Sequence, residues 1–276
     1  MRLGFIGAGS ASTNQSFHLF LFLAAGVMRR HYLFSISGVL LVAAIAMTLW
    51  KNPAIYFHAS DEDASKQLFP SYWSTVEKRE GAIDVVNNPD SILVLVNKER
   101  KLPDFYVPND LTIPNVRFSF DGDKEKMKMR KEAAASLENL FKGAEQDGIY
   151  LFAVSAFRSY DRQKALHTMY RRTEGEAAAA ASSASPGTSE HQTGLAVDLT
   201  AQSVKFEVTP AFEKVKEGQW LARHAHEFGF IIRYPKDKTA VTGYTYEPWH
   251  IRYVGNPHAT YLYEHRLTLE EVMPKK

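Results

Sequence analysis

The sequence predicts an α+β fold: one compact domain with a small, mostly antiparallel sheet flanked by helices, preceded by an N-terminal hydrophobic anchor or signal segment. Short runs of alternating apolar residues, which are typical of strands, are interspersed with longer stretches whose apolar residues recur at helical spacing. An uncharged apolar segment near the N-terminus is set apart from this pattern. With 276 residues, the chain is long enough to bury one substantial core beyond that segment.

The N-terminal apolar segment comprises residues 32–50, which carry no formal charge, follow Arg29 and Arg30 and precede Lys51. Its 19 residues are close to the roughly 20 that an α-helix needs to cross a bilayer. The cationic leading side predicts that the N-terminus stays in the cytoplasm. We therefore expect a single-pass membrane protein whose remaining residues lie outside the cell.

A cleaved signal peptide is the alternative interpretation of this segment, because Ala44-Ile45-Ala46 resembles the small-x-small pattern of a cleavage site. Cleavage would make the protein secreted rather than anchored. Residues 1–31 form a leader whose status stays open, since Met28 offers a second translation start. Residues 51–84 are polar and mixed in charge, so we expect a stalk or linker there, followed by a folded domain over 85–276.

The helices expected in this domain follow the helical spacing of apolar residues. The stretch from Lys124 to Gly148 shows this spacing and has a glycine at its end. A similar pattern runs from Glu213 to Phe228 and is followed by Gly229, a residue suited to ending a helix. Two more helices are expected at 163–172 and after Pro257. Strands are expected at 151–156, 195–199, 230–234 and 251–254.

Composition excludes several classes of site. The chain has no cysteine, which rules out thiol catalysis, cysteine metal ligands and disulfides. Its net charge of +2 is too small to indicate nucleic-acid binding. No feature of the sequence indicates an oligomer.

Two segments about fifty residues apart carry the groups of a divided metal site. The imidazoles of His191 and His250 and the carboxylate of Asp198 make three protein ligands, the number that a catalytic zinc uses when its fourth position stays open. Gly194 lets the chain turn between His191 and the strand that carries Asp198. We therefore expect one Zn²⁺ per chain.

Glu247 is the acid left over beside this set. It lies three residues before His250 with Pro248 between them, so we expect the chain to bend there and run into a strand. A carboxylate beside a metal can take a proton from water and later return it to a leaving amine. This combination is typical of a hydrolase.

A Ser-His-Asp triad formed by Ser189, His191 and Asp198 is a competing interpretation of the same segment. Ser189 lacks the Gly-x-Ser-x-Gly elbow of such enzymes. It also lies only two residues from the supposed base. Both points weigh against the triad.

Arg158 follows the strand expected at 151–156, at the end where catalytic groups are commonly presented. A guanidinium there can bind a carboxylate through two parallel hydrogen bonds or stabilise an oxyanion. The plain alternative is a surface Arg that pairs with Asp161 or Glu190.

Two motifs carry a family resemblance: Ser-x-His-x-x-Gly-x-Ala-x-Asp at 189–198 and Glu-x-Trp-His-x-Arg-Tyr at 247–253. With them, the chain resembles the zinc-dependent D-alanyl-D-alanine carboxypeptidases of the VanY type. The likeness includes the segments 95–98, 102–111 and 155–163, and it covers roughly residues 85 to 266.

The resemblance implies a role for each residue of the two motifs that can do chemistry. It implies that the zinc ligands are His191, Asp198 and His250. Glu247 would be the general base, and Arg158 would steady the oxyanion that forms on the scissile carbonyl. The positions on the substrate side would be Gln163, Ser189 and Trp249. The family usually has a small residue and Tyr before this Arg, where the chain has Ala156 and Phe157, so a role for that phenol hydroxyl is in doubt.

By this resemblance, residues 85–276 form a zinc carboxypeptidase domain that removes the terminal D-alanine of a peptidoglycan stem peptide outside a bacterial membrane. The partners implied are that peptide and, through residues 32–50, the membrane. An L,D-carboxypeptidase or a cell-wall endopeptidase of the same fold is the alternative activity. A non-catalytic wall-binding module is disfavoured by Glu247, because structural zinc sites use four protein ligands and need no nearby base.

Overall fold

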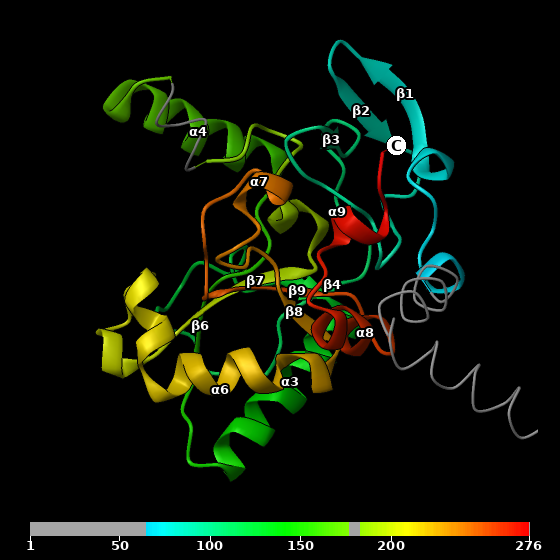
Figure 1. The fold of residues 1–276 in the computed structure, drawn as a ribbon. Coiled ribbons are helices and arrows are strands. Elements are labelled where there is room, and N and C mark those ends of the chain that lie inside the picture. Colours follow the sequence, from blue (N-terminus) through cyan, green and yellow to red (C-terminus); the bar gives the residue numbers. More distant parts are fainter. Residues whose placement is uncertain (1–64, 177–182, 276) are drawn as a thin grey trace, which may run out of the picture. The chain divides into compact units, whose positions relative to one another are not determined.

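The computed structural model describes residues 65–176 and 183–275, which form a mixed α+β fold (Figure 1). The strands are β1 (Val76–Glu80), β2 (Ile83–Val86), β3 (Arg100–Lys101), β4 (Leu111–Thr112), β5 (Met129–Arg130), β6 (Phe152–Ser155), β7 (Ala196–Thr200), β8 (Phe230–Ile232) and β9 (His250–Tyr253). The α-helices are α3 (Lys131–Gln146), α4 (Tyr160–Glu174), α6 (Lys216–His224), α7 (Thr239–Thr242), α8 (His258–His265) and α9 (Leu269–Val272). The short 3-10 helices include η1 (Trp73–Thr75), η2 (Glu190–Thr193), η4 (Pro210–Lys214) and η5 (Ala225–Phe228).

A four-stranded antiparallel sheet in the order β6-β7-β9-β8 forms the centre of the domain. Its register pairs Asp198 on β7 with Ser155 on β6 and with His250 on β9. Directly opposed residues of an antiparallel pair present their side chains on the same face, with Cβ atoms about 5 Å apart. The register therefore brings two residues that lie 52 positions apart in the sequence into contact.

The other face of this sheet packs on the main hydrophobic core. Val197, Leu199 and Ile251 share that core with α3 residues such as Leu137 and Leu140. In Figure 1, α3 and α6 lie on one side of the sheet and α7 lies on the other. Alternation along β7 places Asp198 on one face of the strand and Val197 and Leu199 on the core face, and the strand expected at 195–199 is confirmed.

Two predicted helices differ from the structure. The helix expected from Lys124 begins only at Lys131, because Met129 and Arg130 pair with β4 as strand β5. The helix expected over 213–228 is divided into η4, α6 and η5. It breaks at Val215, which is extended, and it ends at Gly229 as expected.

The described part of the predicted linker is ordered. From residue 65 it contributes η1 and the β1–β2 hairpin, and β2 pairs with β3 in a three-stranded sheet. The Arg100 guanidinium is fully buried and donates to the carbonyls of Tyr72, Thr75 and Leu95, which joins the hairpin to the following loop. At the other end of the chain, Lys275 accepts a hydrogen bond from the Trp73 indole at 3.0 Å.

Several predictions fall on residues 1–64, which lie outside the described residues. They are the leader at 1–31, the apolar segment at 32–50 and the first part of the linker. Within 65–176 and 183–275, no helix combines the length and the apolar character needed to cross a bilayer.

Gly194 ends η2 in the left-handed conformation, with φ +67°, and a Cβ there would lie 2.9 Å from Leu111 Cδ2. We predict that Gly194→Ala lowers the free energy of unfolding by about 2–4 kcal/mol, because backbone strain adds to overpacking. The control is Gly148→Ala, which has φ +69° and open space around it, and which should cost only about 1–2 kcal/mol. Urea unfolding measures both, and equal losses would refute the steric argument.

Candidate active site

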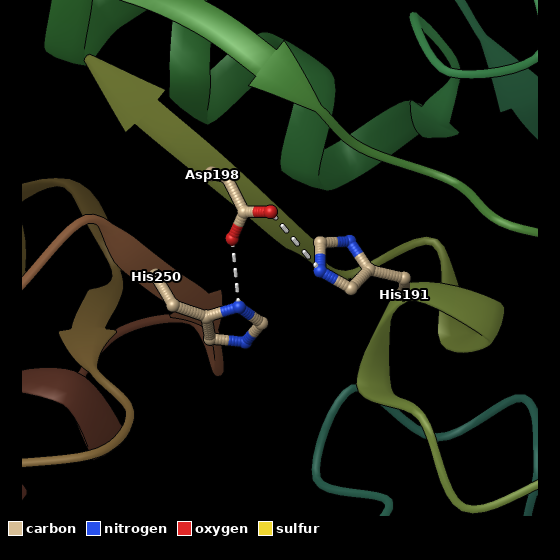
Figure 2. Close-up of side chains that lie close together, drawn as sticks. All are labelled: His191, Asp198 and His250. Atoms are coloured by element: carbon tan, nitrogen blue, oxygen red, sulfur yellow. Dashed lines mark hydrogen bonds and ion pairs between the residues drawn. The ribbon is translucent and has the colours of Figure 1, made fainter. Parts of the chain in front are cut away.

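Three side chains that can bind a metal converge at the centre of the sheet (Figure 2). His191 comes from η2, Asp198 from β7 and His250 from β9, and one ligand atom from each lies within 4.8 Å of the others. The Asp198 carboxylate is 3.4 Å from His191 Nε2 and 2.9 Å from His250 Nδ1. All three residues are buried. Two imidazoles and one carboxylate are a donor set that suits Zn²⁺.

Each imidazole is oriented by a contact of its second nitrogen. His191 Nδ1 lies 2.7 Å from the Ala156 carbonyl, which can only accept, so Nδ1 carries the proton and Nε2 is left with its lone pair. His250 Nε2 lies 3.4 Å from the Glu190 carboxylate, so Nδ1 is the nitrogen that faces Asp198. Such outer contacts commonly fix the tautomer and orientation of metal-binding histidines.

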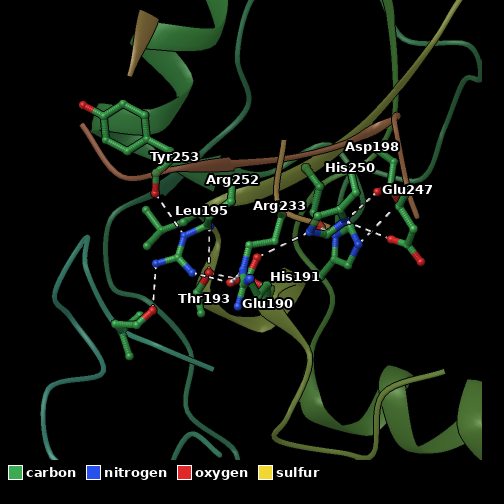
Figure 3. A network of polar contacts seen from close by, with 12 residues as sticks. Glu190, His191, Thr193, Leu195, Asp198, Arg233, Glu247, His250, Arg252 and Tyr253 are labelled. Atoms are coloured by element: carbon green, nitrogen blue, oxygen red, sulfur yellow. Dashed lines mark hydrogen bonds and ion pairs between the residues drawn. The ribbon is translucent and has the colours of Figure 1, made fainter. Parts of the chain in front are cut away.

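Glu190 is the centre of a buried charge network behind His250 (Figure 3). Its Oε1 accepts hydrogen bonds from Arg233 Nε and Arg252 Nη1, both at 2.7 Å. These three side chains have no exposed surface. Arg233 also donates to Glu270, and Arg252 donates to the carbonyls of the 92–94 loop.

The network keeps Glu190 ionised. Burial alone would raise the pKa of this carboxyl, but Arg233 and Arg252 hold it well below its usual range. The same balance acts on Asp198: burial opposes the charge, while His191 and His250 hold the pKa below its usual range. For His250, burial opposes protonation, but the carboxylates of Asp198 and Glu190 raise its pKa to about 9.

Glu247 lies beside this centre in the turn before β9. Its Oε2 is 4.0 Å from His250 Nδ1, and its backbone N–H donates to Tyr234 O. The chain bends after Glu247 and enters β9 at His250, as the sequence predicts. Burial raises the pKa of Glu247 to about 7, which suits a group that takes up and gives back a proton near neutral pH.

Arg158 also lines the pocket, three residues after β6. Its backbone N–H donates to His191 O, and its guanidinium donates to Gln163 Oε1 at 2.8 Å and to Ser155 Oγ at 3.3 Å. Gln163 is buried on α4 and donates in turn to Ala184 O at 2.6 Å. The amide of Gln163 therefore contacts Arg158 and the protein backbone.

These groups line one pocket of about 260 Å³. It contains all eight residues that the sequence singles out: Arg158, Gln163, Ser189, His191, Asp198, Glu247, Trp249 and His250. Ser189 is buried, and Trp249 is half-buried and packs on the main core. A serine triad does not fit, because His191 Nδ1 faces Ala156 O and Nε2 faces Asp198, which leaves no ring nitrogen to take a proton from Ser189.

Sequence reasoning missed the groups that complete this pocket. Tyr234 and Tyr244 also line it, and their rings lie 4.7 Å apart with Tyr234 4.9 Å from the His250 ring. The sequence offers Glu190 only as a surface partner of Arg158. The available signal is an arginine within or next to each of two apolar strands, Arg252 in β9 and Arg233 directly after β8, since buried guanidinium groups need a carboxylate.

Known proteins resemble this chain in sequence and in fold. The family model described as VanY, D-alanyl-D-alanine carboxypeptidase, matches residues 126–256. YodJ of Bacillus subtilis (strain 168), described as a carboxypeptidase by inference, is 44% identical over 217 residues, which are 79% of each chain. The D-alanyl-D-alanine carboxypeptidase of Enterococcus faecalis (strain ATCC 700802 / V583) is 34% identical over 190 residues, 66% of this chain and 65% of the relative.

Two solved structures are similar as well. The LdcB LD-carboxypeptidase is 44% identical and superposes with a TM-score of 0.70 over 74% of this chain and 96% of LdcB. The vancomycin-resistance D,D-pentapeptidase VanY of a VanB-type cassette, solved with Zn(II), is 35% identical. It superposes with a TM-score of 0.53 over 65% of this chain and 97% of that structure.

We predict that Glu190→Gln lowers the free energy of unfolding by about 3–5 kcal/mol, because it removes the carboxylate partner of buried Arg252 and leaves buried Arg233 with Glu270 alone. Glu270→Gln is the matched control, since Glu270 is partly exposed, forms an ion pair with Arg233 and accepts one hydrogen bond from the uncharged Asn97, and it should cost less. Chemical denaturation at neutral pH measures both. A loss for Glu190→Gln no larger than that of the control would contradict the central place of Glu190.

Proposed function

The chain belongs to the VanY family of D-alanyl-D-alanine carboxypeptidases and is a metallopeptidase, and from this membership we propose that it removes the terminal D-alanine of peptidoglycan stem peptides. The observation that carries the proposal is the convergence of His191, Asp198 and His250 beside Glu247 in one pocket. The pocket combines a metal-binding donor set with a spare carboxyl and a guanidinium. That combination suits hydrolysis of a peptide bond.

In this proposal one Zn²⁺ is held by His191 Nε2, Asp198 and His250 Nδ1. The fixed His191 tautomer and the Glu190 contact of His250 support the assignment, since they leave those nitrogens free to bind. When bound, the ion acts as a Lewis acid, polarising the scissile carbonyl and making nearby water more acidic. Three protein ligands leave room for substrate.

Glu247 is the proposed general base. Its carboxylate takes a proton from the attacking water and then gives it to the departing amine of D-alanine. The buried position and the pKa of about 7 support this exchange. A bound cation would lower that pKa and so favour the ionised carboxylate.

Arg158 is the proposed oxyanion partner. Gln163 and Ser155 hold its guanidinium from one side, so its remaining N–H groups can donate to oxygen atoms of the substrate in the pocket. Gln163, Ser189 and Trp249 belong to the substrate side, where Gln163 acts by holding Arg158 in place. No acyl-enzyme forms, because water attacks directly.

Two bonds are candidates for cleavage, and both release D-alanine. A D,D linkage at the end of a pentapeptide agrees with the family description and with the enterococcal relative. An L,D linkage at the end of a tetrapeptide is favoured by the higher identity and TM-score of the LD-carboxypeptidase LdcB. Incubation with defined tetrapeptide and pentapeptide stems, followed by mass spectrometry of the products, decides between them.

The proposed location is the outer face of a bacterial membrane. The support is in the sequence alone: residues 32–50 are uncharged and apolar, and Arg29 and Arg30 precede them. Secretion after signal cleavage is the alternative, and N-terminal sequencing of the mature protein distinguishes the two. The boundary between the apolar segment and the linker at 50/51 forms part of the same proposal, whereas the expected boundary at 84 falls inside β2, so the folded domain begins before it.

We predict that Glu247→Gln lowers kcat for D-alanine release by at least about 100-fold, because the amide cannot take up the proton. Zinc content should stay near one ion per chain, since Glu247 is not a proposed ligand. Asp198→Asn is the contrasting variant, and it should lose both activity and zinc. Assay of released D-alanine together with elemental analysis checks this, and an active Glu247→Gln enzyme would remove Glu247 from its assigned role.

Chelation should abolish hydrolysis of whichever stem peptide is cleaved, and added Zn²⁺ should restore it. A β-lactam should leave the activity unchanged, since it traps enzymes that acylate a serine. Rates measured on the full chain with EDTA, with EDTA followed by Zn²⁺, and with benzylpenicillin test both statements. Activity that persists in EDTA, or covalent labelling by the β-lactam, would overturn the proposed mechanism.

A further inference from the structure

A second depression lies at the start of β6, away from the pocket just described. Its volume is about 560 Å³, and it is lined by Arg117, Tyr150, Phe152, Gln202, Ser203, Lys216 and Glu217. These residues differ from those described as lining the catalytic pocket. The depression combines aromatic rings with hydrogen-bonding and charged groups.

Three aromatic side chains, Tyr150, Phe152 and Phe206, form an exposed surface here that we call the aromatic ledge. Tyr150 is 56% exposed and Phe206 is 40% exposed. The rings of Phe152 and Phe206 meet edge to face, with centroids 4.9 Å apart. Arg117 lies 5.4 Å from the Tyr150 ring centre and 5.5 Å from that of Phe152. Such contacts hold the rings in a fixed arrangement.

The loop that presents Phe206 is strained. Lys205 and Phe206 have φ of +54° and +60°, a conformation that costs about 1–2 kcal/mol for each residue with a side chain. The loop is nevertheless fixed by hydrogen bonds from Phe206 N to Ala201 O at 3.0 Å and from Thr200 Oγ1 to Glu207 O at 2.7 Å. The strained loop exposes the Phe206 ring to solvent, so the strain is not offset by burial of that ring in the core. Strained segments of this kind concentrate at binding sites.

The polar groups of the depression offer both donors and acceptors. Arg117 Nη2 is buried and has no hydrogen-bond partner among the described residues. Ser203 Oγ donates to Glu217 Oε2 at 2.7 Å, and Gln202 and Lys216 add further groups. Charges of both signs are present, so no single ionic ligand is favoured. Flat apolar rings beside mixed donors and acceptors suit a sugar, whose C–H face stacks on a ring while its hydroxyl and acetamido groups make hydrogen bonds.

We propose that the aromatic ledge and its depression form a saccharide subsite, which holds an N-acetylated sugar of the glycan strand while the attached stem peptide lies in the catalytic pocket. This inference rests on the proposed function, because it concerns the substrate of the same site. The ledge and the pocket are connected along the chain: Val208 lines the catalytic pocket, two residues after Phe206. Both residues are exposed.

The chain that joins the two sites limits how far apart they can lie. β6 leads from Phe152 at the ledge toward Arg158 in the pocket, and six residues of extended chain span at most roughly 20 Å. The three or four residues of a stem peptide that precede its last bond reach about 10–14 Å when extended. A sugar at its first residue can therefore rest at the ledge while its last bond lies beside Glu247.

The test compares two substrates that differ only in the sugar: a free stem peptide, and the same peptide joined to its disaccharide. We expect kcat/KM of the unmodified protein to be about five- to tenfold higher for the disaccharide-peptide, the size of one lost aromatic stacking contact. Phe206→Ala should remove that difference and leave the rate on free peptide unchanged. Tyr263→Ala is the control, since Tyr263 is similarly exposed at 44% but lies on α8, outside the ledge.

A second measurement does not depend on catalysis. Binding of the disaccharide alone is monitored by NMR. It should shift the ring signals of Tyr150 in the unmodified protein and leave them unshifted in Phe206→Ala.

Equal rates on both substrates together with no binding of the disaccharide would overturn the saccharide subsite and leave the carboxypeptidase proposal intact. A loss on both substrates in Phe206→Ala would also overturn it, since the ring would then serve the peptide. Absence of hydrolysis with retained disaccharide binding would count against the proposed function alone.

Discussion

The pairing of Asp198 with His250 across β7 and β9 is the contact on which the rest of the site depends. It sets the carboxylate and one imidazole side by side on the face of the sheet that is free of the core. The second imidazole is added by η2, which is joined to the end of β6 through the Ala156 carbonyl and the Arg158 N–H. Three strands and one turn therefore fix the donor set before any ion is bound.

The two acids next to His250, Glu190 and Asp198, differ in the charged groups that surround them. Glu190 is matched by two guanidinium groups, which carry a permanent charge. Asp198 faces two imidazoles, whose charge depends on protonation. Glu190 thus supports the sheet and the orientation of His250, whereas Asp198 is the carboxylate that a cation can take. The cost of burying so many charges is offset only because each has a partner.

The orientations of Asp198 and Glu247 could be predicted from local sequence patterns, whereas their meeting with His191 and His250 depends on the pairing of β7 with β9. Alternation along β7 alone places Asp198 opposite the core residues, and Pro248 alone predicts the bend that brings in Glu247. Helix limits were less predictable, since Met129 and Arg130 form a strand only because β4 lies beside them. Arg233 and Arg252 signal that a buried carboxylate is needed, but they meet Glu190 only in the folded domain, so the sequence does not show which carboxylate it is.

The contact between Trp73 and Lys275 places the first and last parts of the described domain next to each other (Figure 1). Ends that lie together at a surface are compatible with circular permutation. A short peptide could link Lys275 back to the residues before Trp73, and the chain could be opened instead at the exposed turn around Gly122. The central sheet would keep its order in such a rearranged chain, and a reporter or a binding module could then be fused on a different side of the domain.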